Sequence, residues 1–223
     1  MTGMLSLATK PAPAPTTDDE WIDVFRQRGV WRLTRGIVER WVERNAVFFD
    51  VLKQFVPSGG NVLEIGCGPG RHALGAATLG YQVVGIDINE TIVRQAQMNA
   101  RFVVPDGGVT FQVGDMFDLG PIAPAGTFQA ITHGGVMEHL DCAESIRGAL
   151  RAQLAVAPTV VFDIPFDSPK NRELFKRDDI FRQLWTPDQW VHDVLAGLNV
   201  VASATDLHPE ANMTDDLVVV LRG

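Results

Sequence analysis

The chain has 223 residues, of which 46% are hydrophobic and 21% are charged, as is typical of one folded globular domain rather than a disordered chain. Its formal net charge of −8 argues against the broad basic surface that sequence-independent binding of nucleic acid requires. No apolar run reaches the roughly 18 residues that a membrane span needs, and the N-terminus lacks the pattern of a signal peptide. We therefore expect a cytoplasmic protein that binds neither nucleic acid nor a membrane.

The only two cysteines, Cys67 and Cys142, lie far apart in the sequence and outside any CxxC or Cys/His cluster. Zinc sites are usually built from such clusters, so no metal is expected. Two isolated thiols are also compatible with the reducing conditions of a cytoplasm.

The first 57 residues are predicted to form a tail and a helical cap. Residues 10–17 read KPAPAPTT, and alternating prolines favour extended chain, so residues 1–20 are expected to be a flexible tail. From Trp21 to Val56, apolar residues recur at helical spacing, with a break over residues 29–34. This pattern predicts two helices that form a cap over residues 21–57, followed by the main domain over residues 58–223.

Beyond the turn sequence PSGG at residues 57–60, short apolar runs alternate with amphipathic ones. Strands that alternate with crossover helices predict a parallel sheet covered on both faces. The predicted strands are residues 62–65, 83–86, 109–113, 128–132 and 159–164, and the predicted helices are residues 71–79, 90–101 and 143–155, with one more around Met116.

The last third of the chain departs from this alternation. The sequence Thr186-Pro187-Asp188-Gln189 combines a capping threonine, a proline at the first helical position and a glutamine three residues after the cap, which predicts a helix to about Ala196. Residues 199–204 and 217–221 resemble strands joined without a helix, and such strands are most simply antiparallel. The expected fold is an α/β, Rossmann-like three-layer sandwich with a seven-stranded, mostly parallel sheet, one antiparallel terminal strand and an N-terminal helical cap.

A glycine loop follows the first predicted strand, in the sequence LEIGCGPG. Glycines between a strand and a helix let a ligand approach free backbone N–H groups and the positive end of the helix. The spacing is GxGxG, one residue shorter than the GxGxxG of the dinucleotide fingerprint. The loop therefore predicts a ligand site, although not the usual pyrophosphate site.

Acidic residues follow the next two predicted strands. Asp87 ends the second run, where a carboxylate can accept both hydroxyls of a ribose. Asp115 follows the third run, where a second carboxylate could accept the amino group of a base. The carboxyl ends of parallel strands meet at one edge of a sheet, so both acids should lie beside the glycine loop.

These motifs resemble those of a known family. The segments VLEIGCGPG, VVGIDIN, FQVGDMFDL and FQAITHGGVMEHL are similar to successive motifs of the class I S-adenosylmethionine-dependent methyltransferases, of the kind that acts mostly on small molecules. The resemblance implies S-adenosyl-L-methionine as cofactor and S-adenosyl-L-homocysteine as product. The cofactor-binding residues that it implies, from the methionine part to the adenine and the transferable methyl, are Glu64, Gly66, Cys67, Gly68, Gly70, Asp87, Ile88, Asp115, Met116, His133 and Gly134.

Methyl transfer asks little of a protein beyond placement, because the donor is a sulfonium with a good leaving group and the acceptor need only be held in line, about 3 Å away. A base is useful when the acceptor must lose a proton. The candidate catalytic residues are His139, Glu138 and His133, with Asp163, Asp167 and His208 as further candidates at the same edge, whereas His72 and His192 are predicted to be surface or packing residues.

The sequence thus predicts transfer of a methyl group to an O, N or C atom of a small, partly apolar metabolite by a monomer or homodimer. Two alternatives stay open. The first is a nicotinamide-dependent oxidoreductase, against which the GxGxG spacing and the reversed last strand count. The second is a non-catalytic binding module of the same fold, against which the unbroken motifs count.

Overall fold

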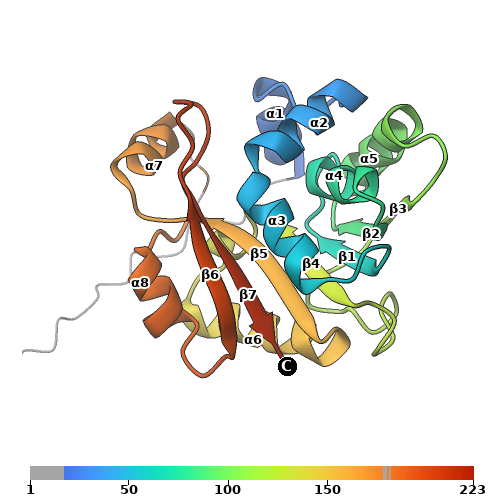
Figure 1. The fold of residues 1–223 in the computed structure, drawn as a ribbon. Coiled ribbons are helices and arrows are strands. Elements are labelled where there is room, and N and C mark those ends of the chain that lie inside the picture. Colours follow the sequence, from blue (N-terminus) through green and yellow to red (C-terminus); the bar gives the residue numbers. More distant parts are fainter. Residues whose placement is uncertain (1–17, 178–179, 181) are drawn as a thin grey trace, which may run out of the picture.

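The computed structural model describes residues 18–177, 180 and 182–223, so most of the expected tail lies outside the described residues. Seven strands form one sheet in the order β3-β2-β1-β4-β5-β7-β6 (Figure 1). Strands β1 to β5 pair in parallel, and β7 is antiparallel to both β5 and β6, which confirms the expected fold class. The strands are β1 (Asn61–Ile65), β2 (Gln82–Asp87), β3 (Val109–Val113), β4 (Ala130–Gly134), β5 (Thr159–Pro165), β6 (Val200–Asp206) and β7 (Asp216–Arg222).

Helices cover both faces of the sheet and divide the core into two clusters. One face packs residues such as Val62 and Val161 against helices α3, α4 and α5, and the other packs Leu63 and Phe162 against α6 and the segment around Trp190. The helices are α1 (Asp18–Gln27), α2 (Arg35–Arg44), α3 (Ala46–Phe55), α4 (Arg71–Thr78), α5 (Glu90–Val103), α6 (Ala143–Val156), α7 (Pro169–Leu174) and α8 (Pro187–Gln189).

The N-terminal region holds three helices, so the expectation of two was wrong. The hydroxyl of Thr34 caps α2 by accepting the N–H of Ile37 at 3.4 Å. Asn45 then ends α2 and precedes α3, and its side-chain amide donates to the carbonyl of Trp41 at 2.8 Å. The apolar spacing continues through Asn45, which is why the sequence pattern did not reveal this break.

The three N-terminal helices have different positions. Helix α3 packs on the sheet beside β5, β6 and β7, as Figure 1 also shows, and it therefore belongs to the layer that covers one face. Helix α1 begins at Asp18, three residues before the expected start at Trp21. Only α1 and α2, with the residues that follow them, contribute side chains to the cavity described below.

Two other expected helices differ from the structure. Around Met116 the chain forms turns instead of a helix, because the carboxylate of Asp115 accepts the N–H of Phe117 at 2.9 Å. The capping box at Thr186 and Gln189 is present as expected. Helix α8 nevertheless continues as a π turn over Trp190–Val194, and the wider turn buries both Trp190 and Val194 in the core.

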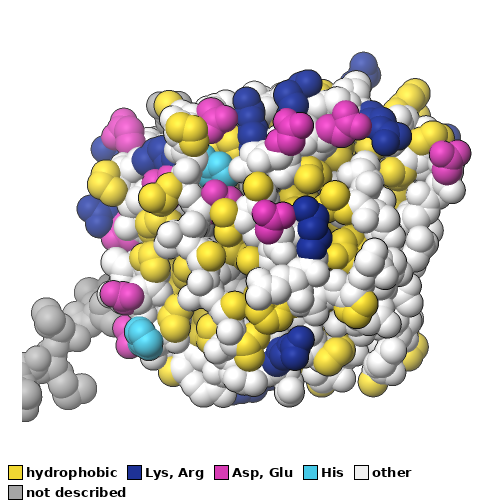
Figure 2. Space-filling model, in the orientation of Figure 1, with side chains coloured by type: hydrophobic (Ala, Val, Ile, Leu, Met, Phe, Trp, Pro, Cys, Tyr) yellow, Lys and Arg dark blue, Asp and Glu magenta, His cyan; other side chains and the backbone are white. Residues whose placement is uncertain are grey.

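Charged side chains are unevenly spread over the surface. Figure 2 shows acidic and basic side chains gathered toward the upper edge of this face, over α1, α2 and α7, with fewer over the lower half. Within the described ranges, none of the helices combines the length and the apolar character that a membrane crossing requires.

Candidate functional site

A cavity of about 640 Å³ lies at the carboxyl edge of the parallel strands. This edge is where open α/β sheets bind ligands, and the volume falls in the range of about 300 to 1,000 Å³ found for small-molecule sites. Helices α1 and α2 cover the cavity, and the side chains that they and the residues after them contribute are Trp21, Phe25, Arg28, Trp41 and Asn45.

The glycine loop forms one wall of the cavity. Gly66 and Gly68 line it in the left-handed conformation, with φ of 61° and 53°, and Cys67 between them is buried. A Cβ atom on Gly68 would lie 3.0 Å from the ring of Phe25, so glycine allows α1 to approach the loop. Gly70 does not line the cavity, because it caps α4 with φ of 101° and packs against Phe111.

Asp87 fixes the glycine loop to the end of β2. Its Oδ2 accepts the N–H of Gly68 at 3.0 Å, and its Oδ1 accepts the N–H of Asn89 at 3.0 Å. Each oxygen has two lone pairs, so a carboxylate held in this way can still accept hydroxyl groups. The structure therefore places Asp87 where the sequence predicted it, on the cavity wall beside the loop.

Asp115 lies on the cavity wall beyond Asp87, with Met116 next to it. Two large apolar side chains, Ile88 and Phe117, also line this end, although they are 68% and 62% exposed. Exposed apolar groups inside a cavity favour a ligand with apolar faces. The predicted residues at the ends of β2 and β3 thus meet at one end of the cavity.

Glu64 lies beneath the loop and does not line the cavity. The hydroxyl of Thr132 donates to its carboxylate. Burial raises the pKa of Glu64 to about 7, because the charged form is poorly solvated there. Its expected place along the ligand is therefore corrected to a supporting position under the loop.

His133 was expected beside the ligand, and this expectation was wrong. Its fully buried ring stacks on Phe162 with centroids 4.9 Å apart, and it does not line the cavity. Neither ring nitrogen has a hydrogen-bond partner among the described residues, and burial lowers the pKa of His133 to about 3. Successive residues of a strand point to opposite faces, so His133 points into the α6 layer while its neighbour Gly134 lines the cavity.

Glu138 and His139 both line the cavity from a 3-10 turn, Met137–His139. Burial raises the pKa of Glu138 to about 8. The Nε2 atom of His139 lies 3.5 Å from Oε1 of Glu138, and its ring packs edge-on against Trp21 with centroids 5.0 Å apart. The turn thus places both predicted catalytic candidates under helix α1.

The sequence prediction missed His72, which lines the cavity from the first turn of α4. Its Nε2 lies 3.2 Å from Oδ2 of Asp163, at the end of β5. Burial alone would lower the pKa of His72, but the adjacent carboxylate of Asp163 raises it above its usual value. A Cβ on Gly134 would contact the His72 ring and lie 2.8 Å from Oδ1 of Asp163, so the pair needs glycine there.

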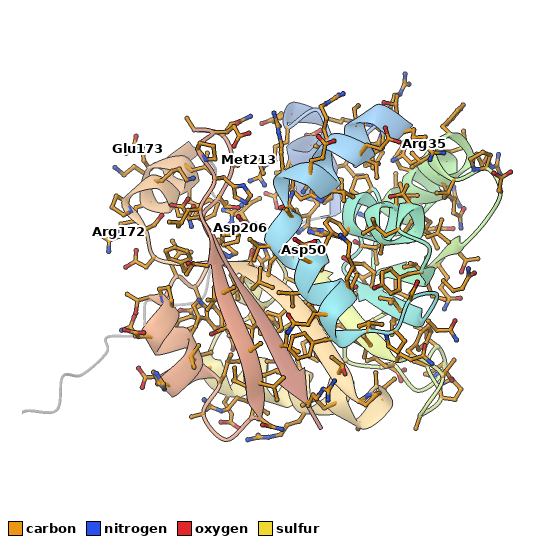
Figure 3. All side chains as sticks on the ribbon, in the orientation of Figure 1. Arg35, Asp50, Arg172, Glu173, Asp206 and Met213 are labelled. Atoms are coloured by element: carbon orange, nitrogen blue, oxygen red, sulfur yellow. The ribbon has the colours of Figure 1, made fainter. Side chains whose placement is uncertain are left out.

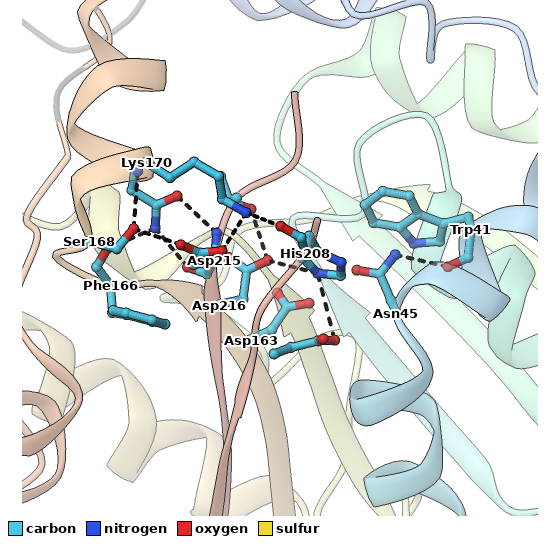
Figure 4. Close-up of polar contacts among 12 residues, drawn as sticks. Trp41, Asn45, Asp163, Phe166, Ser168, Lys170, His208, Asp215 and Asp216 are labelled. Atoms are coloured by element: carbon cyan, nitrogen blue, oxygen red, sulfur yellow. Dashed lines mark hydrogen bonds and ion pairs between the residues drawn. The ribbon is translucent and has the colours of Figure 1, made fainter. Parts of the chain in front are cut away.

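The reversed strand β7 adds Asp216 (Figure 4) to the cavity wall. Thr214, two residues earlier, also lines the cavity. The pKa of Asp216 is raised well above its usual range by burial and by nearby Asp163. The Nε2 atom of His208 lies 3.9 Å from Asp216 and 3.7 Å from Asp206, but His208 itself is buried and does not line the cavity.

Two further candidates have separate places. Asp163 lines the cavity, as expected, whereas Asp167 lies outside it and accepts a hydrogen bond from Nη2 of Arg172 at 2.6 Å. Arg172 lies at the outer edge of the molecule on α7 (Figure 3). Despite the several acids, the described part of the chain holds no group of three or more His, Cys, Asp or Glu side chains arranged to bind a metal.

Comparisons with known proteins agree with this arrangement. Residues 62–156 match the family described as "Methyltransferase domain". The ribosomal protein L11 methyltransferase of Thermotoga petrophila is 44% identical over 59 residues, or 26% of this chain and 22% of that protein. The ubiquinone biosynthesis O-methyltransferase of Xanthomonas axonopodis is 33% identical over 84 residues, or 38% of this chain and 34% of that protein. The matches thus span about a fifth to a third of these curated relatives.

A solved structure extends the similarity to the whole fold. The magnesium protoporphyrin IX methyltransferase from Synechocystis, crystallised with S-adenosylmethionine, has a TM-score of 0.64 at 17% identity, with 95% of this chain and all of that chain covered. Residues 62–156 are therefore similar to the methyltransferase domain, and the chain as a whole shares the fold of that solved methyltransferase structure.

Proposed function

We propose that this protein transfers a methyl group from S-adenosylmethionine to an O, N or C atom of a small, partly apolar metabolite. The observation that carries the proposal is that Gly66 and Gly68, Asp87, and Asp115 line one cavity at the ends of the neighbouring strands β1, β2 and β3, in this order. A cofactor made of an amino acid, a ribose and a base needs a close backbone approach, a hydroxyl acceptor and an amino-group acceptor in this order.

The described residues suit such a cofactor. The carboxylate of Asp87 is oriented by two backbone N–H groups on the cavity wall, where its oxygens could accept ribose hydroxyls. The exposed side chains of Ile88 and Phe117 offer apolar contacts on either side of a planar base, with Asp115 nearby to accept its amino group. When bound, the cofactor would supply an activated methyl group on a sulfonium.

We assign His72 the part of acceptor base. Asp163 accepts a hydrogen bond from Nε2 of His72, which leaves Nδ1 near Gly134 as the nitrogen that can take a proton. The adjacent carboxylate of Asp163 raises the pKa of His72, which makes its imidazole a stronger proton acceptor. Glu138, with a pKa of about 8, is protonated at pH 7 and would donate a hydrogen bond, and His139 stays a second candidate.

The side chains of α1 and α2 that line the cavity support the proposal of a small acceptor. The aromatic side chains of Trp21, Phe25 and Trp41 line the cavity from α1 and α2. They would contact an apolar part of the acceptor and exclude water from it. The relative from Thermotoga is named for a protein acceptor, but the match covers only 22% of its length. The proposal includes a monomer or homodimer in the cytoplasm, in keeping with the free thiols of Cys67 and Cys142.

Calorimetric titration with S-adenosylhomocysteine tests the cofactor. The wild type should bind it, and Asp87→Ala should weaken binding by about ten- to a hundredfold, since charge-assisted hydrogen bonds are lost. Asp50→Ala is the matched control, because Asp50 is exposed on α3 (Figure 3) and should bind like the wild type.

The alternatives give different results in the same titrations. Binding of NAD without any binding of S-adenosylhomocysteine would replace the proposal with an oxidoreductase. Tight cofactor binding without methyl transfer to phenols, carboxylates or amines would instead favour a binding module.

A further inference from the structure

Arg71 is a cation held inside the cavity by an aromatic ring. It is the first residue of α4, directly after the glycine loop, and its side chain lines the cavity. Its guanidinium carbon lies 4.0 Å from the centroid of the Trp41 ring. This contact holds the guanidinium against one face of the indole. The edge of the guanidinium, which carries the N–H groups, stays available to a ligand.

Among the described residues, the guanidinium of Arg71 has no acceptor for these N–H groups. No hydrogen bond or ion pair joins it to any of residues 18–177, 180 and 182–223. The buried indole Nε1 of Trp41 also has no partner among them. Buried donors such as Trp41 Nε1 are nearly always hydrogen-bonded, and the half-buried guanidinium of Arg71 opens into the same cavity, so both can donate to an acceptor that a ligand supplies.

Two cations line the cavity at this place. Arg28 directly follows α1, and burial together with the nearby charge of Arg28 lowers the pKa of Arg71 to about 10, against the smaller opposing effects of Asp163 and Asp216. Arg71 therefore stays charged at neutral pH beside a like charge. The positive end of α4, capped by Gly70 without a side chain, adds to the attraction.

We propose that Arg71, held against Trp41, binds a carboxylate of a ligand in this cavity. A carboxylate fits because its two oxygens match the planar guanidinium in two parallel hydrogen bonds and its single charge balances the cation. Two sources share this chemistry: the α-carboxylate of the cofactor and a carboxylate on the acceptor. The inference rests on the proposed function, and the test below separates the two sources.

The test compares the wild type with Arg71→Met, which keeps an unbranched apolar side chain against Trp41 but has no charge. The control is Arg94→Met, because Arg94 is exposed on α5 and pairs there with Glu90. The probes are S-adenosylhomocysteine, 5′-methylthioadenosine, which lacks the amino-acid carboxylate, and benzoate added to protein saturated with S-adenosylhomocysteine. Calorimetry or a fluorescence titration gives each affinity.

Two results support the proposal and identify the source. If Arg71 binds the cofactor carboxylate, Arg71→Met weakens S-adenosylhomocysteine by about ten- to a hundredfold and leaves 5′-methylthioadenosine unchanged. If Arg71 binds an acceptor carboxylate, S-adenosylhomocysteine binds equally well, while benzoate binds the saturated wild type and no longer binds the variant. Arg94→Met behaves like the wild type in both cases.

Two results overturn the proposal. An equal loss of affinity for S-adenosylhomocysteine and 5′-methylthioadenosine means that Arg71 only supports the loop, and unchanged affinity for all three probes means that it binds no carboxylate. If the wild type itself fails to bind S-adenosylhomocysteine, the proposed function fails, and benzoate titrations of the two unliganded proteins still decide the role of Arg71. Should Arg71→Met not fold, Arg71→Gln also removes the charge and allows the same comparison.

Discussion

His133 and Gly134 are neighbours in β4, but only Gly134 lines the cavity. The alternation of side chains along a strand sends the His133 ring into the α6 layer, where it stacks on Phe162. A buried imidazole with no hydrogen-bond partner among the described residues is costly to protonate, as its pKa of about 3 indicates. We therefore expect His133 to affect the stability of the protein rather than to take part in catalysis.

The pH dependence of stability should show this effect. Between about pH 3 and pH 6.5 the unfolded chain takes up a proton at His133 that the native state does not, so this group makes the free energy of unfolding rise with pH in that window. His133→Phe should remove about 1 to 3 kcal/mol of that rise. Urea unfolding at about pH 4 and about pH 7 measures it.

His192→Phe is the control for this experiment, because His192 is exposed. An unchanged difference in unfolding free energy between the two pH values in His133→Phe would contradict the assignment. Binding of S-adenosylhomocysteine should be the same in both variants, since neither residue lines the cavity.

The ends of β4 and β5 pack tightly against the first turn of α4. At the end of β4, a Cβ on Gly134 would contact the His72 ring and lie 2.8 Å from Asp163. In the middle of α6, Gly148 has open space in place of a Cβ. The same substitution should therefore have opposite effects in the two elements.

Gly134→Ala should lower the free energy of unfolding by about 1 to 3 kcal/mol and separate His72 from Asp163, because an added methyl group overpacks this contact. Gly148→Ala should instead raise it by up to about 1 kcal/mol, since alanine favours a helix more than glycine does. Urea unfolding of both variants checks the signs. Equal effects of the two substitutions would contradict the crowding at Gly134.

The sequence predicts strand ends better than it predicts the residues that reach them from elsewhere. Asp87 and Asp115 were predictable, because each lies at or just beyond the end of an apolar run with the pattern of a strand. His72 was not, because its role depends on which side of α4 faces Asp163. Asp216 was not either, because it lies at the start of a reversed strand, and only the pairing of β5 with β7 brings it to the same edge.

The helices and strands also differ in how well the sequence predicts them. The seven strands and the crossover helices have strong periodic patterns, and the structure confirms them within a few residues. The break at Asn45 and the turns around Met116 depend on side-chain hydrogen bonds to the backbone. Such local bonds compete with helix formation and leave little trace in the spacing of apolar residues.

On the scale of the whole molecule, the cavity lies between the sheet edge and helices α1 and α2. A ligand in the cavity would contact both the sheet edge and helices α1 and α2, and so join them. Helix α6 packs on one face of the sheet and lines no part of the cavity. Ligand binding should therefore stabilise the folded protein and restrict opening of α1 and α2 in particular.

S-adenosylhomocysteine at about a hundred times its dissociation constant should raise the free energy of unfolding by about 2.7 kcal/mol. Amide hydrogen exchange should slow in α1 and α2 more than in α6, since α1 and α2 contribute side chains to the cavity and α6 does not. Equal protection of all three helices would show that the ligand stabilises the protein without being covered by α1 and α2.

The reversed strand has a consequence for the synthesis of the protein. Thr214 and Asp216 complete the cavity wall from the last ten residues, and α3, near the start of the chain, packs against β6 and β7. A chain still held by the ribosome therefore has its glycine loop and Asp87 long before it has a finished cavity. A product that stops before residue 214 lacks this wall and leaves the sheet-facing side of α3 exposed.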